Sequence, residues 1–219
     1  MLRAAGRSFF IADGAKFAFM PAMELGDPGL ENVLVRMEPL GSEHRETLHA
    51  SGAVDAMWKW MPVMSTGTNY DSYFDHTLLS DKLGNSTTFA VFSAVTGDFL
   101  GVAAFLDPNR THRRIQIANL WLVPDARGKG IFSAVQALMI QRALDWGARR
   151  IVWLADERND ASKGALRKLG AIEEGLAREY QRMSDGHWAN MVVFSLLRPE
   201  AKATVERLTA DLAERAAVD

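Results

Sequence analysis

Residues 122–133 read Leu122-Val-Pro-Asp-Ala-Arg127-Gly-Lys-Gly130-Ile-Phe-Ser133, and this stretch decides the fold. An apolar run that predicts a strand ends here, a short basic loop follows, and an amphipathic pattern predicts a helix from residue 131. Two glycines let backbone N–H groups approach a ligand with no β-carbon in the way. The helix start adds unpaired N–H donors and a positive dipole end. With Arg127 and Lys129, these features suit a diphosphate. A basic turn that binds nothing is the alternative at this point.

Two other phosphate-binding loops fit this stretch less well. A P-loop needs an earlier glycine at a fixed spacing and a serine or threonine after the lysine, and both are missing. A dinucleotide-binding fingerprint comes closer, because Gly128-x-Gly130-x-x-Ser133 follows a strand and Asp156 ends the next one. Its third glycine is absent, however, and the roughly 60 residues after Asp156 are too few for the remaining βαβ units.

The sequence on both sides of the loop predicts an α/β (α+β) domain with about seven strands. Alternating or apolar runs predict strands at 33–40, 87–95, 99–106, 115–123, 150–155, 172–182 and 188–197. Helical patterns cover 43–56, 69–83, 131–147, 159–169 and about 200–216. Because no repeat or linker interrupts these elements, residues 31–219 are expected to form a single domain. Residues 1–30 are expected to be a poorly packed extension, since charges interrupt their apolar stretch too soon for a signal peptide.

The composition excludes several classes of protein. With 219 residues, 48% of them hydrophobic and 24% charged, the chain has ordinary globular usage and enough length to bury a core. It has no cysteine, which excludes disulfides, thiol nucleophiles and thiolate-based metal sites. No other cluster has metal-site spacing. A net charge of −2 offers no field for a polyanion, so no nucleic-acid partner is expected. No apolar run reaches the roughly 18 residues of a membrane span, and a cytoplasmic protein is expected.

A resemblance to a known family rests on several motifs in the same order. Arg127-Gly-Lys-Gly130-Ile-Phe132 resembles the R/Q-x-x-G-x-G/A loop of the GCN5-related N-acetyltransferases (GNAT), which binds the pyrophosphate of coenzyme A. Asn159-Asp-Ala-Ser162, followed by Ala165-Leu-Arg-Lys-Leu-Gly170 and Glu174-Gly175, is similar to the pattern of the RimJ/RimL branch of ribosomal-protein acetyltransferases. Trp58-Lys-Trp60-Met-Pro62 resembles the substrate-side segment of that branch. Each motif is weak alone, but their ordered set is specific.

The resemblance, which covers residues 33–212, implies the GNAT fold. In it a central, mostly antiparallel sheet flanked by helices splays open between two neighbouring strands, with acetyl-CoA in the gap and no metal. The cofactor-binding residues that it implies lie before, in and after the loop: Leu122, Val123, Arg127, Gly128, Lys129, Gly130, Ile131, Phe132, Ser133, Asn159 and Ser162. It also implies that Trp58, Trp60 and Met61 bind the substrate, although these residues would equally suit a core. Asn159 would equally suit a plain helix N-cap.

Three departures from the family pattern bear on catalysis. Phe132 occupies the last Gly/Ala position of the loop, so its ring must point away from the phosphates. Leu166 stands where many members carry a tyrosine that protonates the leaving thiolate. Ser162 is the implied substitute, with capping of its own helix as the alternative. Gln116 stands where related sequences often place glutamate, and an amide cannot accept a proton from the amine. Glu179 is the predicted base in its place, with a solvated strand face as the alternative.

Two functions of different classes follow. The first is acetyl-CoA-dependent transfer of an acetyl group to a primary amine of a small molecule or a protein N-terminus, by direct attack in a ternary complex. The intact loop, Asn159 and Ser162 favour it. The second is a catalytically weak coenzyme A-binding sensor or interaction module, which Gln116 and Leu166 favour. The five histidines are scattered, and none is assigned a catalytic role. The sequence leaves the oligomeric state open, and a homodimer is the assembly that we test.

Overall fold

The computed structural model describes residues 25, 29–51, 60–62 and 70–216. Trp58 and most of the predicted N-terminal extension lie outside these residues. Within that extension, Leu25 is buried in the main core and Leu30 begins the first strand.

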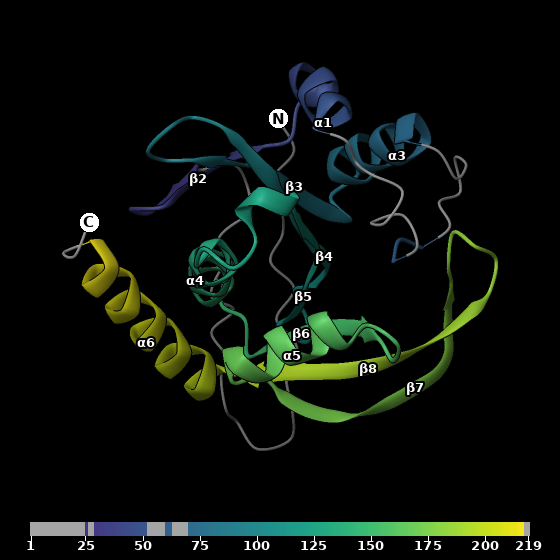
Figure 1. Ribbon diagram of the computed structural model, residues 1–219. Helices are drawn as coiled ribbons and strands as arrows, with labels where there is room; N and C mark the ends of the chain where they lie inside the picture. Colours follow the sequence, from purple (N-terminus) through teal and green to yellow (C-terminus); the bar gives the residue numbers. More distant parts are fainter. Residues whose placement is uncertain (1–24, 26–28, 52–59, 63–69, 217–219) are drawn as a thin grey trace, which may run out of the picture.

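One sheet of eight strands organises the described part of the chain (Figure 1). Its strands are β1 (Leu30–Glu31), β2 (Val35–Pro39), β3 (Ser86–Ser93), β4 (Phe99–Asn109), β5 (Arg114–Leu122), β6 (Arg150–Asp156), β7 (Ile172–Arg182) and β8 (Trp188–Leu197). They lie in the order β1-β2-β3-β4-β5-β6-β8-β7, and only β5 and β6 pair in parallel. The mostly antiparallel sheet that the family resemblance implies is confirmed. Its additional strand is β1, whose 2 residues are too few to show an alternating pattern.

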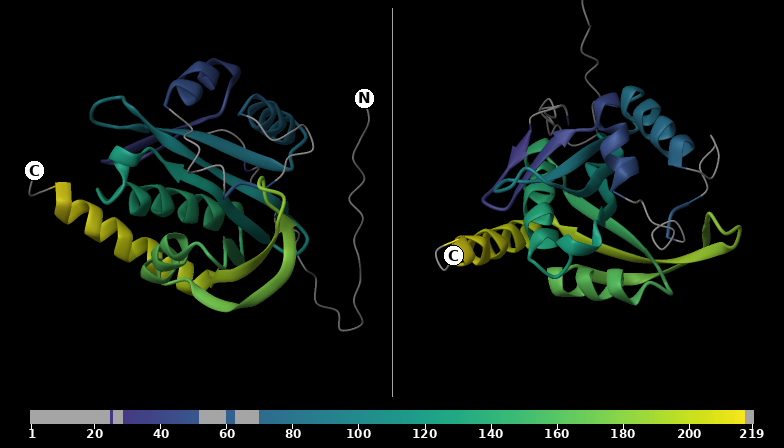
Figure 2. Two further views of the ribbon diagram at one scale, coloured as in Figure 1. Left: turned by 45° about the vertical axis from the view of Figure 1, so that its right-hand side comes forward. Right: turned by 45° about the horizontal axis from the view of Figure 1, so that its top comes forward.

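Helices cover both faces of this sheet (Figures 1 and 2). The helices are α1 (Arg45–Ala50), α3 (Tyr70–Lys82), α4 (Ile131–Trp146), α5 (Asp160–Leu169) and α6 (Arg198–Ala216). α1 follows a 3-10 turn, η1 (Ser42–His44), and ends earlier than the predicted 43–56; residues 52–59 lie outside the described ranges. α4 and α6 pack against each other on one side of the sheet, and α1 and α3 lie on the other. No helix of the described ranges is long and apolar enough to cross a bilayer.

The alternation of side chains along β3 and β4 explains the two layers, because successive residues of a strand point to opposite faces. In β3, Phe89 and Val91 belong to the main core with α4 and α6. Ala90 between them belongs to a second cluster beneath α1 and α3. In β4, Ala103 belongs to the main core and Val102 belongs to the second cluster. The central strands are therefore buried on both faces, which holds them rigid beside the site.

β5 and β6 pair only over residues 114–116 and 150–152, and then diverge. In β5 the register with β4 is interrupted by an extra residue, and Asn119 there adopts a left-handed conformation with φ of 51°. A bulge of this kind bends its strand and increases the twist, which carries the rest of β5 away from β6. The splayed sheet implied by the family resemblance is present.

Candidate active site

A cavity of about 610 Å³ opens where β5 and β6 diverge. The predicted site residues that line it are Trp60, Met61, Leu122, Arg127, Gly128, Phe132, Asn159 and Ser162. Those that belong to the loop but not to the cavity wall are Val123, Lys129, Gly130, Ile131 and Ser133. A second, larger cavity of about 740 Å³ lies between α3 and the end of β4 and contains none of the predicted residues. The first cavity therefore joins the glycine loop to the substrate-side segment 60–62.

The glycine loop leaves a row of backbone donors unused. After the 3-10 turn η2 (Pro124–Ala126), Gly128 and Gly130 adopt φ of 76° and 83°, which glycine tolerates without strain. Gly130 is the N-cap of α4. Within the described part of the chain, the amides of residues 128–133 donate no hydrogen bond. A phosphate would therefore meet several N–H donors together with the positive end of the helix dipole.

The side chains of the loop take separate places. Arg127 donates from Nε to the carbonyl of Leu122, 3.0 Å away, which holds its guanidinium at the end of β5. Lys129 is exposed, whereas Ile131 is buried and offers only its backbone. The ring of Phe132 packs against the main core, so at the loop this residue contributes its amide.

The start of α5 presents two of the predicted residues to the cavity. Asn159 is the N-cap, and its Oδ1 accepts a hydrogen bond from the amide of Ser162 at 3.1 Å. The capping interpretation of Asn159 is therefore correct, and its Nδ2 remains available to a ligand. The cap of this helix is Asn159 and not Ser162. The Ser162 hydroxyl makes no hydrogen bond with the described residues, which leaves it available at the cavity wall.

Three polar atoms in the cavity wall have no hydrogen-bond partner among the described residues. They are Gln136 Oε1, Trp121 Nε1 and Trp153 Nε1. These atoms are themselves shielded from solvent, and a buried polar group left unpaired costs about 1–3 kcal/mol. A hydrogen bond to a ligand in the cavity therefore requires the side chain to turn toward it. Sequence reasoning missed them. A signal was present, since Gln136 is a single amide within the apolar run Ala134-Val-Gln-Ala137, and it is 1% exposed in the structure.

An ion pair lies at the end of the cavity near segment 60–62. Asp156, at the end of β6, lines the cavity and is 4% exposed. Arg158 donates to it from Nε at 3.0 Å, from Nη2 at 2.8 Å and from its amide. Burial acts to raise the pKa of Asp156, but these hydrogen bonds outweigh it and lower the pKa, so the carboxylate is charged. The guanidinium also lies 5.9 Å from the centroid of the Trp60 ring.

The substrate-side segment is fastened to the β7–β8 hairpin. The carbonyl of Met61 accepts a hydrogen bond from the amide of Ser184 at 2.9 Å, and Pro62 forms a bridge with Met183. Met61 is buried, as the core interpretation expects, and it also lines the cavity; its substrate-binding role stays a prediction. Trp58 lies outside the described residues.

Glu179 does not line the cavity. It lies in an irregular stretch of β7 with φ of 45°, and its amide donates to Oδ1 of Asn190 at 2.9 Å. Its side chain is exposed, so its role as a base stays a prediction. Gln116 does line the cavity, at the point where the β5–β6 pairing ends. Among the described residues, no group of three or more histidine, aspartate or glutamate side chains converges as metal ligands do.

The family model described as "Acetyltransferase (GNAT) domain" matches residues 35–172. The chain belongs to this family. It is an N-acetyltransferase. Solved structures of other acetyltransferases share its fold. A putative acetyltransferase from T. thermophilus is 23% identical, with 84% of this chain and 96% of the other covered and a TM-score of 0.74.

Two structures that contain coenzyme A species are also similar to this GNAT chain. Mycobacterium smegmatis RimJ in complex with CoA-disulfide is 19% identical, with 84% and 93% of the two chains covered and a TM-score of 0.70. Spermidine N-acetyltransferase from Vibrio cholerae, in complex with CoA and spermine, is 14% identical, with 78% and 99% covered and a TM-score of 0.64. At these identities, both likenesses show the shared fold.

Proposed function

We propose that this GNAT enzyme transfers an acetyl group from acetyl-CoA to a primary amine of a small molecule or a protein N-terminus. The single observation that carries the proposal is the cavity that joins the glycine loop, at Gly128 and Phe132, to segment 60–62. A thioester held from the loop end would meet an amine that enters from the other end. A ribosomal L7/L12 alpha-N-protein acetyltransferase, RimL, and the spermidine enzyme are structural neighbours, and both acceptor types stay within the proposal.

The chain offers a group for each part of acetyl-CoA. The amides of residues 128–133, with Arg127 and Lys129, would hold the pyrophosphate. Beyond Gln116, the edge of β5 that faces the gap is not paired with β6. Its backbone would therefore bind the pantetheine amides as a neighbouring strand would. Gln136 Oε1 would accept from an amide N–H of the same arm.

The transfer needs little beyond positioning, because a thioester is already an activated acyl donor. The nitrogen of the neutral amine attacks the thioester carbonyl, the C–N bond forms and the C–S bond breaks. The departing thiolate takes a proton from the Ser162 hydroxyl, the proposed donor. The attacking nitrogen loses one proton as the amide forms, and water carries that proton back to the Ser162 oxygen. Glu179 stays the base predicted from the sequence; from its exposed position it would act through water.

The test is thiol release from acetyl-CoA with a panel of monoamines, polyamines and peptides with free N-termini. We expect amine-dependent release and an N-acetylated product in mass spectra. Coenzyme A should also raise the melting temperature, as a ligand specific for the native state does, whereas NAD and ATP should not. Stabilisation without release would favour the sensor, for which Gln116 in the cavity wall is the supporting observation. Stabilisation by NAD alone would contradict both functions.

A cytoplasmic location and a homodimer accompany this proposal as predictions. Cell fractionation tests the first, and light scattering on the purified protein tests the second.

A further inference from the structure

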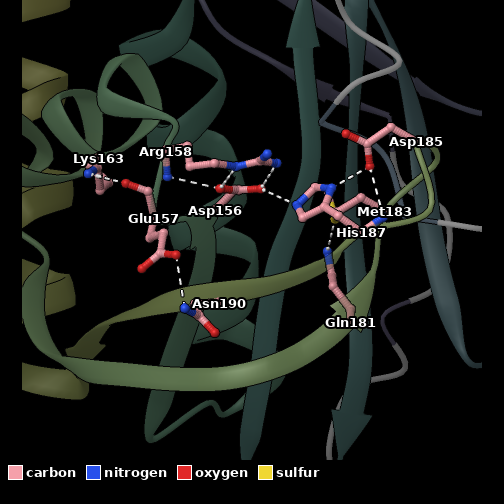
Figure 3. Close-up of polar contacts among 9 residues, drawn as sticks. All are labelled: Asp156, Glu157, Arg158, Lys163, Gln181, Met183, Asp185, His187 and Asn190. Atoms are coloured by element: carbon pink, nitrogen blue, oxygen red, sulfur yellow. Dashed lines mark hydrogen bonds and ion pairs between the residues drawn. The ribbon is translucent and has the colours of Figure 1, made fainter.

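A histidine stands directly behind the cavity carboxylate Asp156 (Figure 3). His187, which follows the β7–β8 turn, directs Nε2 toward Oδ2 of Asp156 at 3.7 Å. Its other ring nitrogen, Nδ1, contacts Oδ1 of Asp185 in the same turn. The Nε2 atom is buried and has no hydrogen-bond partner among the described residues. The three side chains therefore form a row from the cavity wall to the tip of the hairpin.

The two carboxylates determine which nitrogen of the neutral ring carries the proton. Hydrogen bonds from His187 lower the pKa of Asp185, so this carboxylate is an acceptor and Nδ1–H is its donor. The lone pair of Nε2 then faces the charged carboxylate of Asp156, and no proton lies between the two acceptors. Adding a proton to Nε2 would complete the row. The imidazole is thus arranged to receive a proton at Nε2.

The row of side chains is also connected to segment 60–62, where the acceptor would enter. Arg158 contacts both Asp156 and the Trp60 ring, and segment 60–62 is bonded to the hairpin at Ser184. The cations around the histidine are Arg158, which interacts with both carboxylates, and Arg182, whose Nε donates to the carbonyl of Gly186 at 3.3 Å. The side chain of His187 is 31% exposed, so a proton that it receives can leave to solvent.

We propose that Asp156, His187 and Asp185, in place of the exposed Glu179, form a proton relay that deprotonates the acceptor, and that the acceptor is an aliphatic amine, which arrives as an ammonium ion. The inference rests on the proposed acetyl transfer. The N–H bond of the ammonium breaks, and its proton passes by way of the Asp156 carboxylate to Nε2 of His187. The electron pair left on the nitrogen attacks the thioester carbonyl. Asp185 stabilises the imidazolium until the proton leaves to water. Trp60 and the charged Asp156 would favour a cationic acceptor.

Kinetics with two kinds of amine test the relay. His187→Gln should lower kcat at pH 7 by about 10²-fold with the best aliphatic amine of the panel, with no change in the KM for acetyl-CoA. The difference in kcat between the wild type and His187→Gln should shrink at high pH, where the amine is already neutral. It should be absent with methoxyamine, which is neutral at pH 7. Asp185→Asn should show the same pattern with a smaller deficit. His112→Gln changes an exposed histidine that does not line the cavity and is the matched control.

Several results would overturn the relay. An unchanged kcat in His187→Gln would do so, and so would an equal loss with both amines at every pH, because a merely structural role predicts that. Nitrogen NMR of the protein without substrate tests the relay even when no acceptor is known. If the neutral His187 ring carries its proton on Nε2, the relay is refuted. If the wild-type enzyme acetylates no amine, the proposed function is wrong. If the enzyme is active and His187→Gln leaves its kcat unchanged, only the relay is wrong.

Discussion

The Nη1 atom of Arg215 lies 2.8 Å from the position that a β-carbon on Gly130 would occupy. Arg215 is close to the end of α6, so the last helix brings a guanidinium to the glycine loop from a distant part of the sequence. Among the described residues it forms no ion pair. An unpaired cation beside the loop attracts phosphate, and we expect Arg215 to assist Arg127 and Lys129 in holding the cofactor.

Arg215→Gln should weaken coenzyme A binding about threefold to tenfold at low salt, and the difference should shrink at high salt because exposed charges are screened. Isothermal titration calorimetry at two ionic strengths measures both effects. Lys202→Gln removes an exposed charge elsewhere on α6 and should leave the affinity unchanged. Equal affinities for the Arg215 variant and the wild type at low salt would refute the assignment.

Ser162→Ala and Asn159→Ala should have opposite signatures. Because Asn159 is the N-cap of α5, its replacement should cost about 0.5–2 kcal/mol of stability and raise the KM for acetyl-CoA. Ser162→Ala should leave stability nearly unchanged and lower kcat by about 10-fold to 10²-fold, since its hydroxyl acts on charge that develops in the transition state. Thermal unfolding and steady-state kinetics separate the two. A raised KM with normal kcat in both variants would make Ser162 a binding residue.

Gln136→Leu should stabilise the protein and weaken its ligand binding at the same time. The variant removes a buried acceptor that has no partner among the described residues, which should raise the free energy of unfolding by about 1 kcal/mol without ligand. If Oε1 accepts from the pantetheine arm, coenzyme A affinity should fall about tenfold. Melting temperatures measured with and without coenzyme A report both changes. A variant that melts lower and binds normally would show that Gln136 has a structural role.

Glu174→Gln should remove a pH-dependent part of the stability. Hydrogen bonds from Arg150 and Ser195 lower the pKa of Glu174 from 4.5 to about 2. A carboxyl with a lowered pKa stabilises the fold above its unfolded value and loses that contribution as the pH falls toward 2. Because the side chains are about a third exposed, we expect about 1 kcal/mol at pH 6.

Denaturant unfolding of the Glu174 variant between pH 6 and pH 3 checks this expectation. The wild type and the variant should converge as the pH falls. A constant difference between wild type and Glu174→Gln across the range would contradict the linkage.

Elements with strong local periodicity were predictable from the sequence. The helix predicted at 131–147 is Ile131–Trp146 in the structure, and the strands predicted at 172–182 and 188–197 are Ile172–Arg182 and Trp188–Leu197. The point at which β5 and β6 stop pairing is not a local property, and only the family resemblance indicated it. The glycine loop was predictable for the same reason as the helix, since all of its donors are consecutive in the chain.

The side chains that come together from distant segments were missed. Asp156 meets His187 only because β6 pairs with β8, which places Asp156 opposite Met191. Nothing in the sequence around His187 indicates that register, so a single histidine could not be distinguished from a surface residue. Arg215 was missed because its position depends on the packing of α6 along α4. The sequence indicated the glycine-loop end of the cavity better than the end near segment 60–62, because the residues of the loop are consecutive in the chain.

The short pairing between β5 and β6 gives the cofactor a role in the lifetime of the protein. Strands β1–β5 form one hydrogen-bonded ladder, and β6, β8 and β7 form another. The two ladders pair only over residues 114–116 and 150–152, next to the hydrogen bonds that the amides of Arg149 and Arg150 donate to the carbonyl of Arg113. A molecule bound in the gap would add cohesion across this seam and would raise the free energy of opening one ladder from the other. Proteases act on such opened states. The cellular abundance of the enzyme would then rise and fall with the supply of its own cofactor.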